Sequence, residues 1–272
     1  MKSDRILVVG AHVGDADVMA GALAAHFSRQ GGEITFLHLT YGERGNPRVP
    51  PEKYRIQKMA EAEESAKKLG VKVMFMGLED GNLSVSNELS RRIAMIIRKL
   101  RPSTVITHWM GSTHQDHAAA HYLTLNAVEY AASQTLEGEP HKVGEVYFAE
   151  NVEDPYFFFP TVFVDVSDVF DVYMDALKVH ENIRQSAYGI NFLQYYEGIL
   201  RSRGASVGLK FASALAERPA RRIIRNRNGL SEGSPYPSRG PAGKCARELR
   251  FPSSLKGRGT PGASPSPSCQ VS

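Results

Sequence analysis

Cysteine is absent from residues 1–217 of this 272-residue chain; both cysteines, Cys245 and Cys269, lie in the C-terminal segment at 218–272. The N-terminal part can therefore hold neither a disulfide framework nor a thiolate nucleophile. Long hydrophobic runs are also missing. No stretch approaches the roughly 18 apolar residues of a membrane span, and the first apolar run is too short for a signal peptide. We therefore expect a cytoplasmic protein with no membrane partner.

Acidic residues are scarce in the C-terminal segment. Residues 218–272 contain eleven Lys and Arg against two Glu, a net charge of +9, which leaves −5 for residues 1–217. Pro, Gly and Ser make up nearly half of this segment, and the hydrophobic periodicity of the earlier chain disappears. Such a segment buries too little apolar surface to offset its ordering entropy. We predict a folded domain at 1–217 and a disordered tail at 218–272.

The basic tail explains the pI of about 9.0 without indicating a specific nucleic-acid partner. Its only aromatic residues are Tyr236 and Phe251, so it lacks the interleaved aromatic side chains on which bases stack. We expect no specific nucleic-acid binding. The sequence leaves the oligomeric state open, with a homo-oligomer as one option.

Short apolar runs alternate with helical patterns along residues 1–217. This alternation is typical of βαβ units, in which a mostly parallel sheet is covered by helices on both faces. We predict an α/β, Rossmann-like three-layer fold. The expected strands are residues 5–10, 34–40, 71–76, 103–107, 145–149 and 161–166; the expected helices are residues 15–29, 52–69, 87–100, 117–133 and 167–185, the last with Ser167 or Asp168 as its N-cap.

Metal-ligand residue types follow two of the predicted strands. His12 and Asp15 come after the first strand, and His114, Asp116 and His117 come after the fourth. Ligands of open α/β sheets bind beyond the carboxyl ends of the strands, where neighbouring loops meet. His12, Asp15 and His117 could there form a three-ligand set with an open fourth position, as catalytic zinc requires. Taken alone, His-x-x-Asp is more often a turn in which Asp15 caps the next helix, but two such clusters in one domain favour a metal site.

The same residues resemble those of a known family. Ala11-His12-Val13-Gly14-Asp15-Ala16 is similar to the Ala-His-Pro-Asp-Asp-Glu motif, and His114-Gln115-Asp116-His117 to the His-Pro-Asp-His motif, of the PIG-L/LmbE-like zinc-dependent N-acetylglucosamine deacetylases. Further similar segments are residues 39–45, 78–83, 164–180 and 201–212, so the resemblance covers about 1–217.

The resemblance implies a role for each motif residue. His12, Asp15 and His117 become ligands of zinc, or of another divalent metal such as Fe²⁺. His114 becomes the group that stabilises the oxyanion and protonates the leaving amine, with Asp116 orienting its imidazole. Arg44 and Asp80 lie in segments that resemble substrate-contacting loops. The implied reaction is deacetylation of a small amino-sugar substrate by a metal-activated water.

One position departs from the family motif. The first aspartate of its Asp-Asp pair, which the family uses as the general base, falls on Gly14. Either Asp17 or Glu43 takes this role, or His114 performs both tasks, or the protein binds metal and carbohydrate with little turnover. Because the ligand set is intact, we favour a working hydrolase over a binding protein of the same fold.

Other patterns have weaker support. Residues 204–208 match Gly-x-Ser-x-Gly, but a helical pattern precedes them and no histidine follows His180, which excludes a nucleophile elbow. The glycines after the first strand have the wrong spacing for a dinucleotide site. We expect His121 to be a partly exposed helix residue, and His180 either to approach the site or to pack in the interior. His26, His38, His108 and His141 have no distinguishing spacing.

Overall fold

The computed structural model of the chain describes residues 4–185 and 189–218. A seven-stranded sheet with the order β3-β2-β1-β4-β5-β7-β6 runs through this part of the chain. Strands β1 to β5 pair in parallel, whereas β7 is antiparallel to both β5 and β6. The strands are β1 (Arg5–Gly10), β2 (Glu33–Thr40), β3 (Lys72–Leu78), β4 (Thr104–His108), β5 (Glu145–Ala149), β6 (Val162–Asp165) and β7 (Ala212–Glu217).

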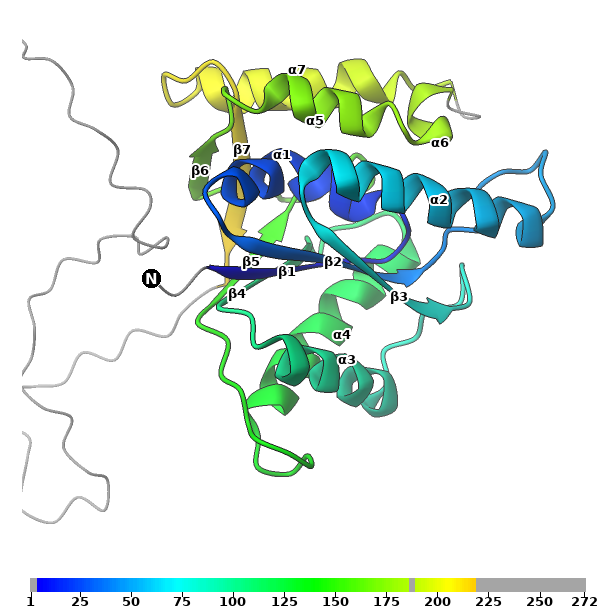
Figure 1. The fold of residues 1–272 in the computed structure, drawn as a ribbon, viewed down its shortest axis with the longest axis vertical. Coiled ribbons are helices and arrows are strands. Elements are labelled where there is room, and N and C mark those ends of the chain that lie inside the picture. Colours follow the sequence, from blue (N-terminus) through cyan, green and yellow to red (C-terminus); the bar gives the residue numbers. More distant parts are fainter. Residues whose placement is uncertain (1–3, 186–188, 219–272) are drawn as a thin grey trace, which may run out of the picture. The chain divides into compact units, whose positions relative to one another are not determined.

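Helices cover both faces of the sheet (Figure 1). The helices are α1 (Asp15–Arg29), α2 (Pro51–Leu69), α3 (Asn87–Leu100), α4 (Gln115–Ala132), α5 (Phe170–Leu177), α6 (Glu181–Arg184) and α7 (Phe192–Ala205). In Figure 1, α3 and α4 lie on one side of the sheet, and the other helices lie on the opposite side. The predicted α/β fold with three layers and a mostly parallel sheet is confirmed.

Burial on both faces explains why the strands read as continuous apolar runs. Leu7 and Val9 of β1 are fully buried in a cluster with Ile93 of α3 and Leu123 of α4. Val8, which alternates with them along the strand, is also fully buried. Because successive strand residues point to opposite faces, a strand covered on both sides needs apolar residues at every position.

Two parts of the chain differ from the prediction. The expected helix at 167–185 is divided into α5 and α6, and His180 between them turns into the interior toward Asp17. Ser167 does not cap α5, because its hydroxyl is held by the backbone of Phe211, and Val169 is the N-cap. Strand β7 was not predicted, since its sequence is rich in alanine and ends close to the basic tail.

The predicted boundary at 217/218 stays a prediction. Apart from Arg218, the tail lies outside the described residues.

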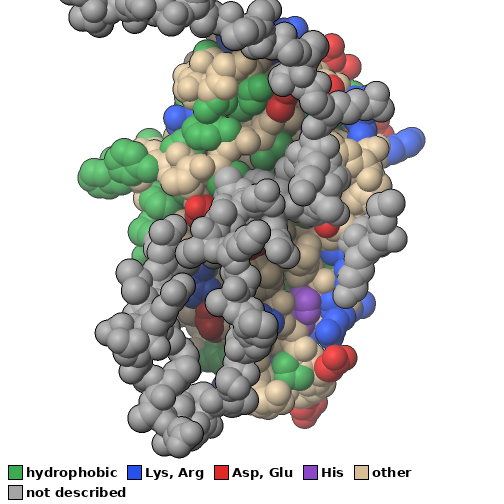
Figure 2. All heavy atoms as spheres, turned by 90° about the vertical axis from the view of Figure 1, so that its left-hand side faces the viewer, with side chains coloured by type: hydrophobic (Ala, Val, Ile, Leu, Met, Phe, Trp, Pro, Cys, Tyr) green, Lys and Arg blue, Asp and Glu red, His purple; other side chains and the backbone are tan. Residues whose placement is uncertain are grey.

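None of the helices within 4–185 and 189–218 combines the length and hydropathy needed to span a membrane. Figure 2 views the left-hand side of Figure 1, where the parallel strands begin, and shows acidic and basic side chains interspersed with hydrophobic ones.

Arg98 of α3 is a buried cation that holds the end of α4 in place. Its guanidinium donates to backbone carbonyls that include those of Ala131 and Leu136, at 3.1 and 3.0 Å. We expect Arg98→Met to lower the free energy of unfolding by about 3 kcal/mol, because several buried carbonyls lose a charged donor. Urea denaturation measures this change. Arg92→Met, at an exposed position of the same helix, is the control and should change it by less than about 0.5 kcal/mol.

Candidate active site

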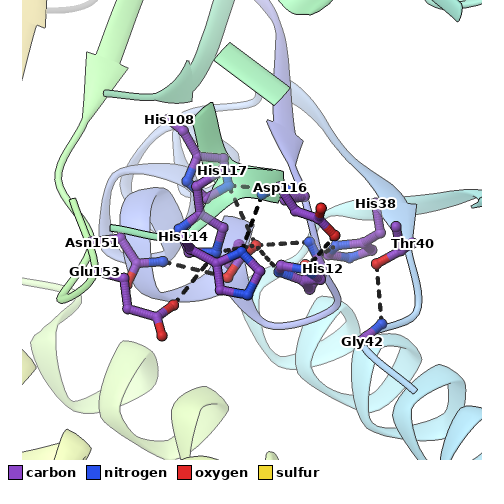
Figure 3. A network of polar contacts seen from close by, with 12 residues as sticks. His12, His38, Thr40, Gly42, His108, His114, Asp116, His117, Asn151 and Glu153 are labelled. Carbon is purple, nitrogen blue, oxygen red and sulfur yellow. Dashed lines mark hydrogen bonds and ion pairs between the residues drawn. The ribbon is translucent and has the colours of Figure 1, made fainter. Parts of the chain in front are cut away.

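The loops that follow the parallel strands meet at one edge of the sheet. Strands β1 and β4 are neighbours, with Val9 paired to Thr107, so the loop after Gly10 lies beside the loop after His108. Strand β5 adjoins β4 on its other side and leads into Asn151–Asp154. The predicted juxtaposition of the two histidine clusters follows from this strand order, and Figure 3 shows His12, His114 and His117 close together.

The turn after β1 is shaped around the carboxylate of Asp15. Its Oδ2 accepts the backbone N–H of His12 at 2.7 Å and lies 3.2 Å from Nδ1 of the same histidine. The N-cap of α1 is Gly14, with no side-chain cap, so Asp15 is not the helix cap considered from sequence. Gly10 permits this turn, because a Cβ there would lie 3.1 Å from both the backbone nitrogen of Ala16 and the Cβ of Asp15. The carboxylate therefore faces the imidazoles.

His117 is held by a carboxylate that sequence reasoning missed. In the first turn of α4, its Nδ1 lies 3.0 Å from Oδ1 of Asp154, while its Nε2 faces Asp15 Oδ2 at 3.5 Å. The other oxygen of Asp154 lies 2.9 Å from Nδ1 of His108, and both partners are fully buried. Burial raises the pKa of Asp154, but the two histidines outweigh it and hold that pKa well below its usual range. Asp154 thus orients His117 and leaves its Nε2 free for a ligand bond.

Asp154→Asn is expected to weaken zinc binding by about 10- to 100-fold, because an amide cannot hold both histidines as the carboxylate does. The measurement is zinc competition against a chelator of known affinity. Glu145→Gln removes a charge at the exposed start of β5 and should leave the zinc affinity unchanged. Equal affinities of the two variants would show that Asp154 does not support the site.

His12 is surrounded by three carboxylates. Besides Asp15, its ring contacts Asp80 and Asp116: Nε2 lies 3.2 Å from Asp80 Oδ1 and 3.3 Å from Asp116 Oδ2. Burial lowers the pKa of His12, yet the carboxylates raise it well above its usual value. The expected contact of the Asp116 carboxylate with the His114 ring is replaced by these bonds to His12 and by backbone N–H groups of Gly81 and Leu83. Asp116 thus connects the loop after β3 to His12.

His114 stands at the wall of a cavity of about 870 Å³. It is the N-cap of α4, and its Nδ1 accepts the backbone N–H of Asp116 at 3.2 Å. This bond leaves the ring proton of the neutral imidazole on Nε2. Burial lowers the pKa of His114, and the neighbouring His117 and His12 lower it further. A neutral imidazole with a free N–H is therefore available to a bound molecule.

Arg44 and Asp80 are joined to each other at the cavity. The backbone N–H of Arg44 donates to Asp80 Oδ2 at 2.8 Å, and its guanidinium donates to the Asp80 carbonyl at 2.8 Å. The guanidinium also pairs with Glu79. Both predicted substrate-contacting residues line the cavity, where they offer groups that hydrogen-bond to hydroxyls.

Neither carboxylate suggested as a substitute base lines the cavity. Asp17 is buried against Ser65 and His180. Glu43 accepts the backbone N–H of Asp80 at 3.2 Å. Among the described residues, the carboxylates that do line the cavity are Asp15, Asp80, Glu153 and Glu181. Of these, half-exposed Glu153 reaches to 3.6 Å from His117 Nε2.

Several histidines have surroundings that spacing did not reveal. His108 ends β4 and lies 3.3 Å from Asp15 Oδ2; burial lowers its pKa, but Asp15 and Asp154 raise it to about 9. The expected exposure of His121 is wrong, since it is buried with Nδ1 bonded to the His108 carbonyl at 2.8 Å. The polar run after β5 was a signal for Asp154, because it follows a strand end just as the two histidine clusters do.

The donor atoms fit a divalent metal. One ligand atom each from His12, Asp15 and His117 lies within 4.8 Å of the others, as the predicted ligand set requires. Two imidazoles and one carboxylate are a known donor set for catalytic zinc. Two further groups are equally compact, namely His12 with His114 and Asp116, and His108 with His117 and Asp154.

Part of the chain is similar to a family of known proteins. Residues 7–128 match PIG-L, described as GlcNAc-PI de-N-acetylase. Diacetylchitobiose deacetylase of Thermococcus kodakarensis is 29% identical over 191 residues, which cover 65% of this chain and 69% of that protein. This chain is similar to the PIG-L family over residues 7–128. The resemblance of its two motifs to this family is thereby confirmed.

Other relatives show how far the PIG-L likeness reaches. The 1D-myo-inositol 2-acetamido-2-deoxy-alpha-D-glucopyranoside deacetylase of Thermobifida fusca is 28% identical over 181 residues, which cover 54% of this chain and 62% of that protein. The 4-carboxy-2-hydroxymuconate hydratase of Pseudomonas putida KT2440 has the same fold, with a TM-score of 0.72, 23% identity and coverage of 82% of this chain and 99% of that one. Because one fold carries different reactions, the function has to be argued from the site.

Proposed function

We propose that this protein is a metal-dependent hydrolase that removes the acetyl group from an N-acetylglucosamine-type amino sugar or its conjugate. The observation that carries the proposal is the convergence of His12, Asp15 and His117 beside a large cavity. The similar proteins of Thermococcus kodakarensis and Thermobifida fusca are deacetylases by name. A cavity of about 870 Å³ lies within the range of small-molecule sites.

Three side chains would hold the metal. His12, Asp15 and His117 are the proposed ligands, with zinc as the proposed ion and Fe²⁺ as the alternative. A metal held there supplies Lewis acidity toward the acetamide carbonyl and the attacking water. Asp154 and Asp116 keep the imidazoles of His117 and His12 in position, so the ligands need little rearrangement.

His114 is the proposed partner of the reacting amide. Since its Nδ1 accepts from Asp116, its Nε2–H is the group that donates to the oxygen on which negative charge develops. When the C–N bond breaks, the amine nitrogen takes up the proton that the attacking water has lost, and His114 Nε2 is the proposed relay, so its imidazole is neutral again after the step. Arg44 and Asp80 are the proposed contacts to sugar hydroxyls. Asp116 is thus a positioning residue that sets the tautomer of His114 through its backbone N–H.

The test is acetate release by zinc-loaded protein from a panel of N-acetylglucosaminides that includes diacetylchitobiose and an inositol conjugate. We expect at least one of them to release acetate, and chelation of the metal to stop the release. The alternative is a metal- and carbohydrate-binding protein with little turnover, because Gly14 offers no carboxylate. That alternative predicts sugar binding without acetate release. The cytoplasmic location and the homo-oligomer stay predictions.

A further inference from the structure

Gly14 leaves a space beside two buried nitrogen donors. A Cβ built on this residue would lie 3.7 Å from Nζ of Lys58 and 3.9 Å from Nδ1 of His180, and no other heavy atom beyond its two chain neighbours would lie within 4 Å. Gly14 and Lys58 both line the cavity that the proposed metal ligands His12 and Asp15 also line. A molecule bound in this cavity could therefore reach both the space at Gly14 and the proposed metal ligands.

Lys58 is a buried ammonium whose hydrogen-bonding capacity is only partly used. Its side chain is 2% exposed, and Nζ donates to Asn182 Oδ1 at 3.2 Å. Its carboxylate neighbour, Glu61, is 3.7 Å away at Oε2, which neutralises the charge without a hydrogen bond of ordinary length. A cation buried in this way is stable only when its remaining N–H groups find acceptors.

His180 presents a second donor with no partner. Its side chain is fully buried, and neither ring nitrogen has a hydrogen-bond partner among the described residues. Nε2 faces Asp17 Oδ1 at 3.2 Å, and Nδ1 faces Glu61 Oε2 at 3.7 Å. Burial opposes the charged form of His180, but Asp17 and Glu61 outweigh it and raise the pKa of the imidazole. Nδ1 makes no hydrogen bond in the described part of the chain, and a Cβ on Gly14 would lie 3.9 Å from it.

We propose that the space at Gly14 is a subsite for a carboxylate group, held by Lys58 Nζ and His180 Nδ1. A carboxylate offers two acceptor oxygens to these two donors. Arg48 lines the same cavity and has no ion-pair partner within the described part of the chain, so it attracts an anion to the entrance.

The inference rests on the proposed function where it names a substrate: an N-acetylated amino sugar that carries a carboxylate. Gly14 immediately precedes the ligand Asp15, so the carboxylate would lie close to the reacting amide. The same subsite would take a free small carboxylate. Separate measurements distinguish a carboxylate of the sugar substrate from a free carboxylate.

Direct binding is measured with difluoroacetate, followed by ¹⁹F NMR on the zinc-loaded protein. Lys58→Met keeps a side chain of similar length but removes its charge, and it should weaken the binding of difluoroacetate by about tenfold or more. Lys53→Met makes the same change at an exposed position of α2 and is the matched control, with unchanged binding. Gly14→Asp, which places its own carboxylate in the space, should also abolish binding, and it keeps the test valid if Lys58→Met fails to fold.

Three outcomes would overturn the subsite. Equal affinity of Lys58→Met and the parent would place difluoroacetate elsewhere, for example on the metal. Retained binding in folded Gly14→Asp would show that the space is not used. Tighter Lys58-dependent binding of inorganic phosphate than of difluoroacetate would assign the subsite to another anion. None of these measurements needs deacetylation, so they stand even if the proposed reaction fails.

The substrate arm compares N-acetylglucosamine with an N-acetylated amino sugar that bears a carboxylate. We expect a KM at least about tenfold lower for the acidic sugar, and we expect Lys58→Met to remove this difference while Lys53→Met preserves it. A preference that survives in Lys58→Met would overturn the substrate class. Equal KM values, together with Lys58-dependent difluoroacetate binding, would assign the subsite to free carboxylates.

Discussion

Gly14→Asp is expected to raise the rate of acetate release from a neutral N-acetylglucosaminide by about 10²- to 10⁴-fold. The substitution restores the carboxylate that the family motif has at this position. Beyond the two chain neighbours, the nearest heavy atom to the added Cβ is Lys58 Nζ at 3.7 Å, so the side chain has room. The backbone φ of 105° disfavours a side chain, at a cost on the order of 1 kcal/mol, and aspartate is among the residues that tolerate such angles best. Initial rates of acetate release at saturating zinc measure the gain.

Gly14→Asn is the matched control for this substitution. It has the same size and backbone cost as aspartate but cannot take up a proton, so it should stay at the parent rate. If Gly14→Asp releases acetate no faster than the parent protein does, the parent already has a general base. Glu153 would then be the residue to test, because its carboxylate lies at the cavity 3.6 Å from His117 Nε2.

His117→Ala is expected to lower the bound zinc after dialysis and to reduce acetate release by about 10³-fold or more. The loss follows from removing one of three ligands, because Lewis acidity is worth several kcal/mol and each step of about 1.4 kcal/mol is tenfold in rate. Zinc content by elemental analysis and acetate release are measured on the same preparation. The variant also leaves Asp154 without one of its two histidine partners.

His26→Ala is the control for loss of a histidine. His26 lies near the C-terminal end of α1, where its ring contacts Asp168 at 3.4 Å, and α1 begins at the site and runs away from it. Zinc content and rate should both stay at the parent level. Full zinc content in His117→Ala would instead point to the group formed by His12, His114 and Asp116.

The ligand loops could be predicted from sequence because their positions depend on local rules. His12 and His117 each follow an apolar run that ends in a polar loop, and parallel neighbouring strands carry such loops to one edge of the sheet. Pairing of β1 with β4 then brings the two loops together. The alternation of strands and helices indicates βαβ units and therefore a mostly parallel sheet, so the fold class could also be predicted.

The supporting groups depend on tertiary contacts, and local patterns mark at most the segment that contains them, not the individual residue. Asp154 contacts His117 only because β5 pairs with β4, and its sequence neighbours do not mark it as different from Glu153. Lys58 looks like a surface lysine on a charged helix, but α2 packs so that Lys58 lines the cavity together with Tyr54. The sequence also does not show that the carboxylate of Asp116 contacts His12 while only its backbone N–H contacts the ring of His114.

Strand β7 affects the order in which the protein can fold during its synthesis. It is made after the other six strands, but it lies between β5 and β6 in the sheet. Strand β6 pairs only with β7 among the described strands, so it has no partner until residues 212–217 have left the ribosome. Until then the nascent sheet ends at β5, whose unpaired edge can recruit a strand of another molecule. A chain that ends before Ala212 therefore has all of its proposed metal ligands but an open sheet edge.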